Sequence, residues 1–507
     1  MYERERRAAG TVHTPRTGSR ATMRSHMPQS QPNILFITSD QHRGDTLGCA
    51  GHPCVRTPHL DRLAYEGVRF ENAYSDCPVC IPARTTMITG VKSSTYGCPE
   101  YAERFRIQRA PEAFLGSLMT QAGYQTALVG KRHWHTDTSF KAGFETVIPI
   151  ERCKREQQLH VRRDGYVFGI GANELHPTLS PIPPELYGTD WIVDHCIEYV
   201  RERERNRPFF LWSSFIDPHP PFAIHEPFYS MYDNSPIPEP AIGTWEDAET
   251  CPVAQFTHRT AYNSKPMGWD ELRKARGVYY GMITNMDHQL GRLFGYLQLH
   301  GLWDDLWVIY ASDHGEHLGD HYDIAKSSFY NSAARLPFLI RPPRALQQAN
   351  AGVVSDALIE LADLLPTFCR LTGIAAPEDV EGKDLVPLVM GEQRAVRDRL
   401  YGAIDAQHMV HDGRHKYIYF VRDGREQLFD HVADPNDLDD IAPAMPEKVR
   451  EMRQRLLERL HAINSPDLGN GTLRNKGERV KDAQAVRRRN SLGWVCAGRS
   501  LEWGGGV

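Results

Sequence analysis

The sequence lacks three features: a long apolar run, abundant cysteine and a surplus of charge of one sign. A membrane-spanning helix needs about 18 consecutive apolar residues, so we expect no membrane segment. Lys and Arg total 59 and Asp and Glu total 64, which gives a formal charge of -5. Because nucleic-acid-binding proteins carry a strongly basic surface, this balance argues against a general nucleic-acid binder.

The ten cysteines are scattered over 507 residues, far fewer than a disulfide-stabilised scaffold uses. This usage is typical of a reducing compartment. Residues 1–31 contain arginines but no apolar segment of the kind found in a secretory signal. We therefore expect residues 1–31 to form a disordered arm, and we expect a cytoplasmic protein.

Short apolar runs alternate with amphipathic stretches along most of the chain. The runs that resemble strands are 33–38, 125–129, 209–215 and 307–311. The stretches with helical spacing are 58–67, 111–123, 190–203 and 270–300. This alternation predicts an α/β fold in which helices cover both faces of a large, mostly parallel sheet.

The character of the chain changes after about residue 375. Short antiparallel strands are expected at 401–419 and 427–429, followed by an amphipathic helix at 447–463. We predict a main domain over 32–380, a smaller α+β domain over 381–465 and a tail over 466–507. The tail is rich in Gly and basic residues, as in the arm of a homo-oligomer.

One internal segment, 218–268, is rich in Pro and aromatic residues and has weak periodicity. A long irregular insertion in a compact domain is typical of a lid or binding loop. The aromatic residues of 215–245 suit an aromatic or sugar ring, although such residues are also ordinary core.

Polar residues follow two of the expected strands at the point where each ends. Asp40 and Gln41 follow the first strand, and Ser312–Glu316 follow the strand at 307–311. Two such clusters meeting at one sheet edge would form an oxygen-rich site for a hard divalent cation. Either cluster alone is also typical of a helix cap. The turn over 316–320 is expected to be scaffold.

A third cluster contains Cys77-Pro-Val-Cys80. Zinc binding would need a second ligand pair, and redox chemistry a thioredoxin-like context; neither is evident. Instead, Pro82 favours a helix that begins near Cys80. The free N–H groups and dipole of a helix N-terminus favour an anion, which Arg84, one turn later, is placed to contact.

The pattern C-x-P-x-R from Cys80 to Arg84, followed by Thr89-Gly90, resembles the signature of the type I sulfatases. These are formylglycine-dependent enzymes of the alkaline phosphatase superfamily, and the signature cysteine is oxidised to formylglycine. Five further motifs over residues 32–465 resemble the family: PNILFITSDQHRGDTLGCAGHP, TPHLDRLAYEGVRFENAY, GYQTALVGKRHWH, DPHPPF and SDHGEHLGDH followed by Lys326. The resemblance implies an alkaline-phosphatase-like sandwich with a sulfatase catalytic domain and a small α+β C-terminal domain.

The resemblance also implies roles for individual residues. The implied ligands of one divalent metal are Asp40, Gln41, Asp313, His314 and the formylglycine made from Cys80. The implied anion-binding and proton-transfer groups are Arg84, Lys131, His133, His219 and Lys326. The metal is usually calcium in sulfatases and manganese in phosphonate hydrolases. Residues 91–97 depart from the family pattern in a stretch that tends to line the substrate pocket.

The activity implied is hydrolysis of a sulfate monoester of a small molecule, after a formylglycine-generating enzyme has modified Cys80. The hydrated aldehyde would attack sulfur, with His219 or Lys326 protonating the leaving oxygen and His133 taking the remaining hydroxyl proton. A phosphonate monoester or phosphodiester hydrolase on the same site is the alternative, and the Lys131-x-His133 pair favours the sulfatase. A third hypothesis is an anion-binding protein in which Cys80 stays a thiol.

Overall fold

The computed structural model describes residues 31–136, 140–161, 173, 175–242 and 268–478. The predicted N-terminal arm up to residue 30, residues 243–267 of the predicted lid, and the tail beyond residue 478 lie outside the described residues.

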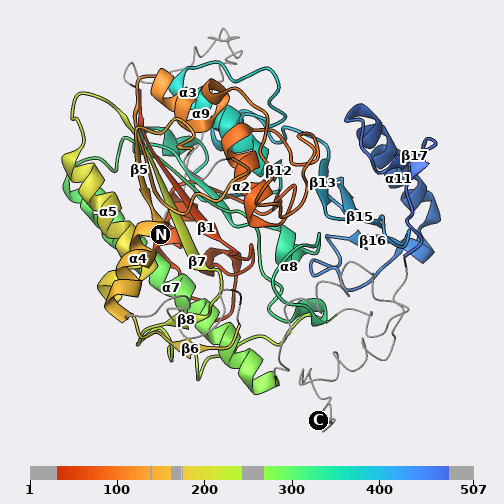
Figure 1. Cartoon of the computed structure of the whole chain (residues 1–507), viewed down its shortest axis with the longest axis horizontal. Coiled ribbons are helices and arrows are strands. Elements are labelled where there is room, and N and C mark those ends of the chain that lie inside the picture. The colour runs from red at the N-terminus through yellow and green to blue at the C-terminus, as the bar shows by residue number, and fades with distance from the viewer. Residues whose placement is uncertain (1–30, 137–139, 162–172, 174, 243–267, 479–507) are drawn as a thin grey trace, which may run out of the picture. The chain divides into compact units, whose positions relative to one another are not determined.

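An eight-stranded sheet forms the centre of the main domain (Figure 1). From edge to edge its strands are β11 (Val353–Ser355), β2 (Val68–Phe70), β10 (Phe338–Arg341), β9 (Leu306–Ser312), β1 (Asn33–Asp40), β7 (Phe209–Pro218), β4 (Gln125–Gly130) and β5 (Thr146–Pro149). Only β10 runs against the others. The sheet is therefore mostly parallel, as the sequence predicts.

Both faces of the sheet are covered, because the central strands carry apolar residues on both faces over most of their length. On β1, Ile34 and Phe36 enter one core, and Leu35 and Ile37 enter the core on the opposite face. The first core is completed by α2 (Cys80–Thr89), α3 (Leu115–Gln121), α9 (Leu364–Thr372) and α10 (Val386–Val389). The second is completed by α1 (Pro58–Glu66), α4 (Ile150–Val161), α5 (Gly188–Glu202) and α7 (Trp269–Leu299). A strand buried on both faces reads as a continuous apolar run.

The predicted strands and helices of the main domain are confirmed, with one difference. The helix predicted over 111–123 is interrupted at Phe114, which has extended dihedral angles and separates a 3-10 turn at Pro111–Ala113 from α3. Phe114 is buried in the first core. Burial of this ring against the sheet therefore outweighs a continuous helix. The smaller elements nearby are β3 (Ala73–Tyr74), β6 (Thr178–Leu179), β8 (Ala223–Ile224), α8 (Asn331–Ala334) and β12 (Ile359–Glu360).

The C-terminal part contains the predicted antiparallel strands and amphipathic helix. Its four-stranded sheet runs β13 (Leu400–Ile404), β14 (Gln407–His411), β15 (His415–Phe420) and β16 (Glu426–Asp430) in order. One face packs on α11 (Pro446–Ala462), and the other packs on residues such as Phe329 of the main domain. A two-stranded hairpin, β17 (Leu468–Gly469) and β18 (Thr472–Leu473), follows. The predicted boundary at residue 380 stays a prediction.

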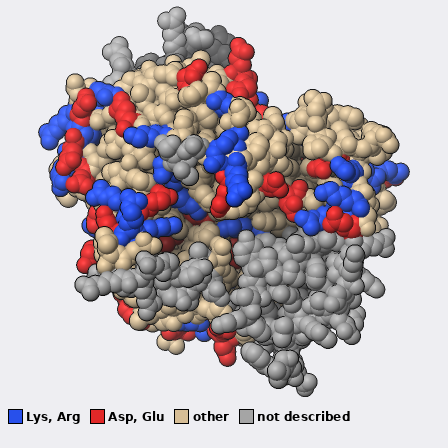
Figure 2. All heavy atoms as spheres, in the orientation of Figure 1, with Lys and Arg blue, Asp and Glu red and all other residues tan. Residues whose placement is uncertain are grey.

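On the face drawn in Figure 2, lysine and arginine side chains are interspersed with acidic ones over much of the surface. This mixture matches the near balance of charges in the sequence. None of the helices within the described ranges is both long and apolar enough to cross a membrane.

A buried ion pair fixes the small sheet to the main domain. Lys416 Nζ on β15 lies 2.6 Å from Asp437 Oδ2 and donates to Asn331 Oδ1 of α8 at 2.7 Å. The side chains of Lys416 and Asp437 are fully buried. Removal of the lysine would therefore leave a carboxylate without its counter-charge in a dry environment.

We expect Lys416→Met to lower the free energy of unfolding by about 3 kcal/mol, because Asp437 then remains buried and unpaired. Urea denaturation followed by circular dichroism measures this change. The matched control is Arg414→Ala, two residues earlier, whose exposed ion pair with Asp430 should contribute nothing measurable. Equal effects of the two substitutions would contradict the prediction.

Candidate active site

Four adjacent parallel strands deliver the predicted polar residues to one edge of the sheet. Asp313 follows β9, Asp40 ends β1, His219 follows β7 and Lys131 follows β4. In the register of β1 and β9, Ser39 is paired with Ser312, which places Asp40 beside Asp313. The predicted meeting of the two clusters is confirmed. The carboxyl ends of neighbouring parallel strands are where α/β proteins place their binding sites.

The strand β4 needs a glycine where it delivers Lys131. Gly130 has a φ of 111°, and a Cβ at this position would lie 2.0 Å from the carbonyl oxygen of Ser214 on β7. This close approach lets the Lys131 N–H donate to that carbonyl at 2.8 Å. The lysine is thereby held at the edge of the sheet.

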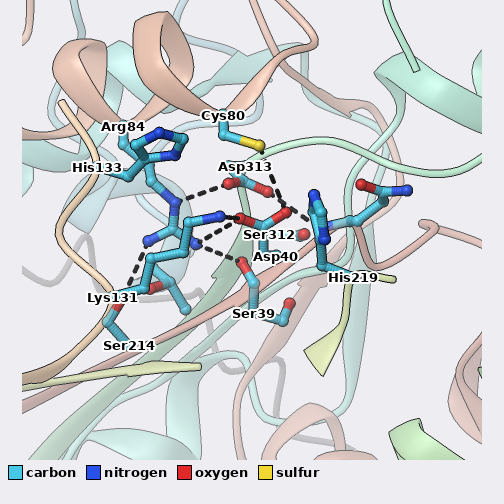
Figure 3. Close-up of polar contacts among 12 residues, drawn as sticks. Ser39, Asp40, Cys80, Arg84, Lys131, His133, Ser214, His219, Ser312 and Asp313 are labelled. Carbon is cyan, nitrogen blue, oxygen red and sulfur yellow. Dashed lines mark hydrogen bonds and ion pairs between the residues drawn. The ribbon is translucent and has the colours of Figure 1, made fainter. Parts of the chain in front are cut away.

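Cys80 is the first residue of α2, as the position of Pro82 predicts. Its Sγ lies 3.1 Å from His314 Nε2 and 3.6 Å from Asp40 Oδ1. Only 2% of the residue is exposed. Figure 3 shows the sulfur above the carboxylates of Asp40 and Asp313. Segments separated by more than two hundred residues therefore converge on one sulfur atom.

Arg84 lies on the next turn of α2, and its guanidinium lies beside the two carboxylates (Figure 3). Its Nε donates to Asp313 Oδ2 at 2.7 Å, its Nη1 donates to Ser214 Oγ at 2.9 Å, and its Nη2 lies 3.5 Å from Asp40 Oδ2. The side chain is completely buried. Arg84 thus holds the carboxylates in place, and its predicted contact with an anion stays a prediction.

Charge governs the protonation of this cluster. Burial alone would raise the pKa of Asp40, but Lys131, His219 and Arg84 hold it below its usual range. Burial and the neighbouring charge of Asp40 raise the pKa of Asp313.

Burial alone would likewise raise the pKa of the Cys80 thiol, but Lys131, Lys326 and His314 lower it well below its ordinary value. The site is therefore built to concentrate negative charge among fixed cations.

The predicted metal ligands fit a divalent cation. Ligand atoms of Asp40, Cys80, Asp313 and His314 all lie within 4.8 Å of one another, and all four residues are buried. Two buried carboxylates at this separation repel each other, and their oxygen atoms are the ligands that hard divalent cations prefer. These residues are therefore suited to hold one cation between them.

Gln41 is the fifth predicted ligand, and both polar atoms of its side-chain amide make hydrogen bonds. Its amide nitrogen donates to the carboxylate of Glu316, and its Oε1 accepts a hydrogen bond from Lys326 Nζ. The residue has a φ of 67°, in the left-handed region. Its role as a ligand stays a prediction.

Glu316 belongs to the second polar cluster of the sequence, but its contact with Gln41 is not among the expectations drawn from the sequence. Its carboxylate is fully buried and accepts hydrogen bonds from Gln41 and from the backbone N–H groups of Leu318 and Ala325. It therefore orients Gln41. The only signal in the sequence is its position three residues after Asp313.

A cavity of roughly 870 Å³ opens in front of Cys80. The predicted site residues that line it are Cys80, Lys131, His133, His219 and Lys326. Arg84 is not among the lining residues that the structure describes. The predicted site residues therefore fall into two groups. The carboxylates and Arg84 are buried behind the cavity wall, and the residues just named line the cavity.

The two cavity histidines differ in their hydrogen bonds. His219 Nδ1 donates to the carbonyl of Pro220 at 2.6 Å, so its Nε2 accepts from Lys326 Nζ at 2.8 Å. Burial, and then the charge of Lys326, lower the pKa of His219 to about 4, so its imidazole is neutral near pH 7. His133 Nε2 lies 3.4 Å from the Tyr101 hydroxyl, and its Nδ1 has no partner among the described residues.

Two expectations concern the wall of the cavity. Residues 91–97 do not line the cavity, whose wall includes residues 101–106 instead. Of the aromatic residues in the 215–245 segment, Phe215 and Phe222 are buried in cores. The aromatic side chains at the cavity come from elsewhere: Tyr101, Trp134 and Tyr187.

Comparisons with known proteins find related sequences over most of the chain. A family model described as Sulfatase matches residues 32–374, and one described as N-sulphoglucosamine sulphohydrolase, C-terminal, matches residues 315–465. An arylsulfatase from Clostridium perfringens is 31% identical over 463 residues, covering 85% of this chain and 94% of the relative. An N-acetylglucosamine-6-O-sulfatase from Bacteroides thetaiotaomicron is 26% identical over 511 residues, covering 86% and 88%.

Solved structures give the same fold. The phosphonate monoester hydrolase of Agrobacterium radiobacter superposes with a TM-score of 0.70 and 25% identity. The match covers 85% of this chain and 96% of that protein. An alkaline-phosphatase-like fold with a smaller C-terminal domain is therefore confirmed.

We expect Ca²⁺ to raise the melting temperature of metal-depleted protein, because a cation bound only by the folded state stabilises it. At about one hundred times Kd the gain is about 2.7 kcal/mol. Asp313→Asn should abolish most of the shift in differential scanning calorimetry. The control, Asp194→Asn on the exposed face of α5, should retain it. The absence of a shift with both Ca²⁺ and Mn²⁺ would contradict a metal site here.

Proposed function

Because this chain belongs to the sulfatase family, a family of sulfuric ester hydrolases, we propose that it cleaves a sulfate monoester through a formylglycine made from Cys80. The supporting observation is the position of Cys80 Sγ, at the start of α2 and against Asp40 and His314. A formylglycine-generating enzyme is the partner required. Because Cys80 is buried within a helix, its oxidation has to precede folding of this segment.

Two groups complete the proposed site. Formylglycine, once formed, supplies a hydrated aldehyde oxygen as the nucleophile toward sulfur. A divalent cation, for which we expect calcium, supplies positive charge that stabilises the developing negative charge. The side chains that would hold the cation are Asp40, Asp313 and His314, with Gln41 and the Cys80-derived group as further ligands.

Lys131 and Lys326 are proposed to bind the sulfate group. Both line the cavity beside Cys80, and each is fixed by a strong contact: Lys131 with the carboxylate of Asp40, and Lys326 with Gln41 and His219. A sulfate monoester repels nucleophiles because of its own charge. Two fixed ammonium groups neutralise that charge without any rearrangement during the reaction.

The hydrogen bonds favour Lys326 over His219 as the group that protonates the leaving oxygen. His219 donates from Nδ1 to a carbonyl and accepts at Nε2 from Lys326. Neither nitrogen of His219 has a proton to spare. Lys326 holds three protons on Nζ and faces the cavity. We therefore assign Lys326 as the general acid and His219 as the residue that positions it.

His133 is suited to the opposite task. Its Nδ1 makes no hydrogen bond within the described part of the chain, and the residue lines the cavity. A free ring nitrogen beside Cys80 is available to accept the hydroxyl proton that must leave before sulfate is released. This requirement follows from the aldehyde hydrate, which has a second hydroxyl.

We expect the protein, produced in a host that makes formylglycine, to hydrolyse an aryl sulfate with a higher kcat/KM than the corresponding aryl phosphonate monoester. Cys80→Ala should lower the sulfatase kcat/KM by roughly 10⁴-fold or more, because the nucleophile is lost. Steady-state kinetics with both esters measures the preference. The reverse preference would favour the phosphonate monoester or phosphodiester hydrolase, and unchanged activity in Cys80→Ala would contradict the site.

A general acid matters most when the leaving alcohol is a strong base. We expect Lys326→Ala to lower kcat by about 10²–10⁴-fold on an alkyl sulfate and far less on 4-nitrophenyl sulfate, because nitrophenolate leaves without a proton. His133→Ala, the matched comparison, should affect both substrates equally. An equal loss on both substrates for Lys326→Ala would remove its role as the acid.

A further inference from the structure

The cavity carries more positive charge than one sulfate group requires. Besides Lys131 and Lys326, four cationic side chains line it: Arg104, Arg106, Arg132 and Lys154. Arg104 and Arg106 lie in the loop after α2, and Lys154 lies on α4. Arg104 and Lys154 are both exposed and both line the cavity, so they lie where it opens to solvent.

The partners of these cations separate them into two groups. Arg132 lies 3.6 Å from the carboxylate of Glu151, and Arg106 donates to the carbonyl of Phe105 at 2.8 Å. Arg104 and Lys154, in contrast, make no salt bridge or hydrogen bond within the part of the chain that the structure describes, although the charge of Glu151 acts on Lys154. Two unpaired cations therefore face the same space.

The acidic side chains of the loop and of α4 have their direct contacts with other residues of the cavity. Glu151 forms an ion pair with Arg132. Glu103 accepts a hydrogen bond from the Tyr101 hydroxyl at 2.8 Å. Desolvation at the cavity wall, and then the charge of Lys131, lower the pKa of Lys154, while the charge of Glu151 raises it. An anion that enters the cavity would relieve the repulsion that remains between Lys131 and Lys154.

The size and the aromatic wall of the cavity indicate what enters. Its volume of roughly 870 Å³ is in the range of sites that enclose a whole small molecule, not only a sulfate group. Tyr101 is 50% exposed, and its ring packs against His133 with a centroid distance of 5.7 Å. A ring in the alcohol part of the substrate could therefore stack on Tyr101, beside the reacting group.

We propose that the alcohol part of the substrate carries a second anionic group, a carboxylate or a further sulfate, which Arg104 and Lys154 bind. This proposal rests on the proposed function, in which Lys131 and Lys326 bind the sulfate that is cleaved. Arg104 and Lys154 are then residues that determine specificity, since they contact the part of the substrate that does not react.

The test compares three aryl sulfates that differ only in the substituent opposite the ester: carboxymethyl, sulfomethyl and the neutral N-methylcarboxamidomethyl group. We expect kcat/KM to favour at least one anionic substrate over the neutral one by about tenfold, the size of one charge-assisted hydrogen bond. The carboxymethyl and sulfomethyl probes distinguish the two kinds of anion. The preference should lie mainly in KM and should weaken with added salt.

Substitution of the two cations provides the decisive comparison. Arg104→Gln combined with Lys154→Gln should remove the preference, and Lys154→Glu should reverse it. The matched control is Arg155→Gln on the same helix, at an exposed position that is not among the cavity-lining residues; it should leave the preference unchanged.

The outcomes separate this inference from the proposed function. Equal kcat/KM values of the wild-type protein for all three sulfates would overturn the inference and leave the sulfatase site intact. An equal loss on all three substrates in the double variant would also overturn it, because the cations would then only attract the reacting sulfate. No hydrolysis of any sulfate by formylglycine-containing protein would overturn the proposed function and this inference together.

Discussion

The structure depends on the burial of two neighbouring carboxylates, Asp40 and Asp313, at the ends of adjacent parallel strands. Like charges at this distance destabilise a folded protein unless cations compensate them. Arg84 supplies that compensation, with its guanidinium fully buried against both side chains. Because Arg84 is on α2, the same contact fixes the start of this helix, and hence Cys80, above the carboxylates. The geometry of the site thus follows from one electrostatic requirement.

Much of this arrangement follows from the sequence, because it depends on regular elements. Apolar runs such as 33–38 predict parallel strands, and parallel strands end at the same edge of a sheet, so the meeting of Asp40 and Asp313 follows. The helix start at Cys80 follows from Pro82. These inferences need only the periodicity of strands and helices and the register that a parallel sheet imposes.

The contacts among Gln41, Glu316 and Lys326 do not follow from the sequence, because they are made by irregular loops. Gln41 has a positive φ, as do Leu318 and Ala325 in the loop that carries Glu316 and Lys326. Such backbone angles reverse the direction of a side chain without any periodic signal. The resemblance to a family gives Lys326 a role but not its partner. A buried glutamate between two site residues is therefore visible only in three dimensions.

The chemistry and the choice of substrate come from different parts of the fold. The strand ends of the parallel sheet hold the carboxylates, Lys131 and His219, and each is fixed by buried contacts that tolerate little change. The cavity wall contains residues of the 101–106 loop and of α4, where exposed cations such as Arg104 have few contacts to maintain. Loops and helix faces of this kind vary without disturbing a rigid scaffold. A change in the leaving alcohol that the enzyme accepts therefore requires no change at the strand ends.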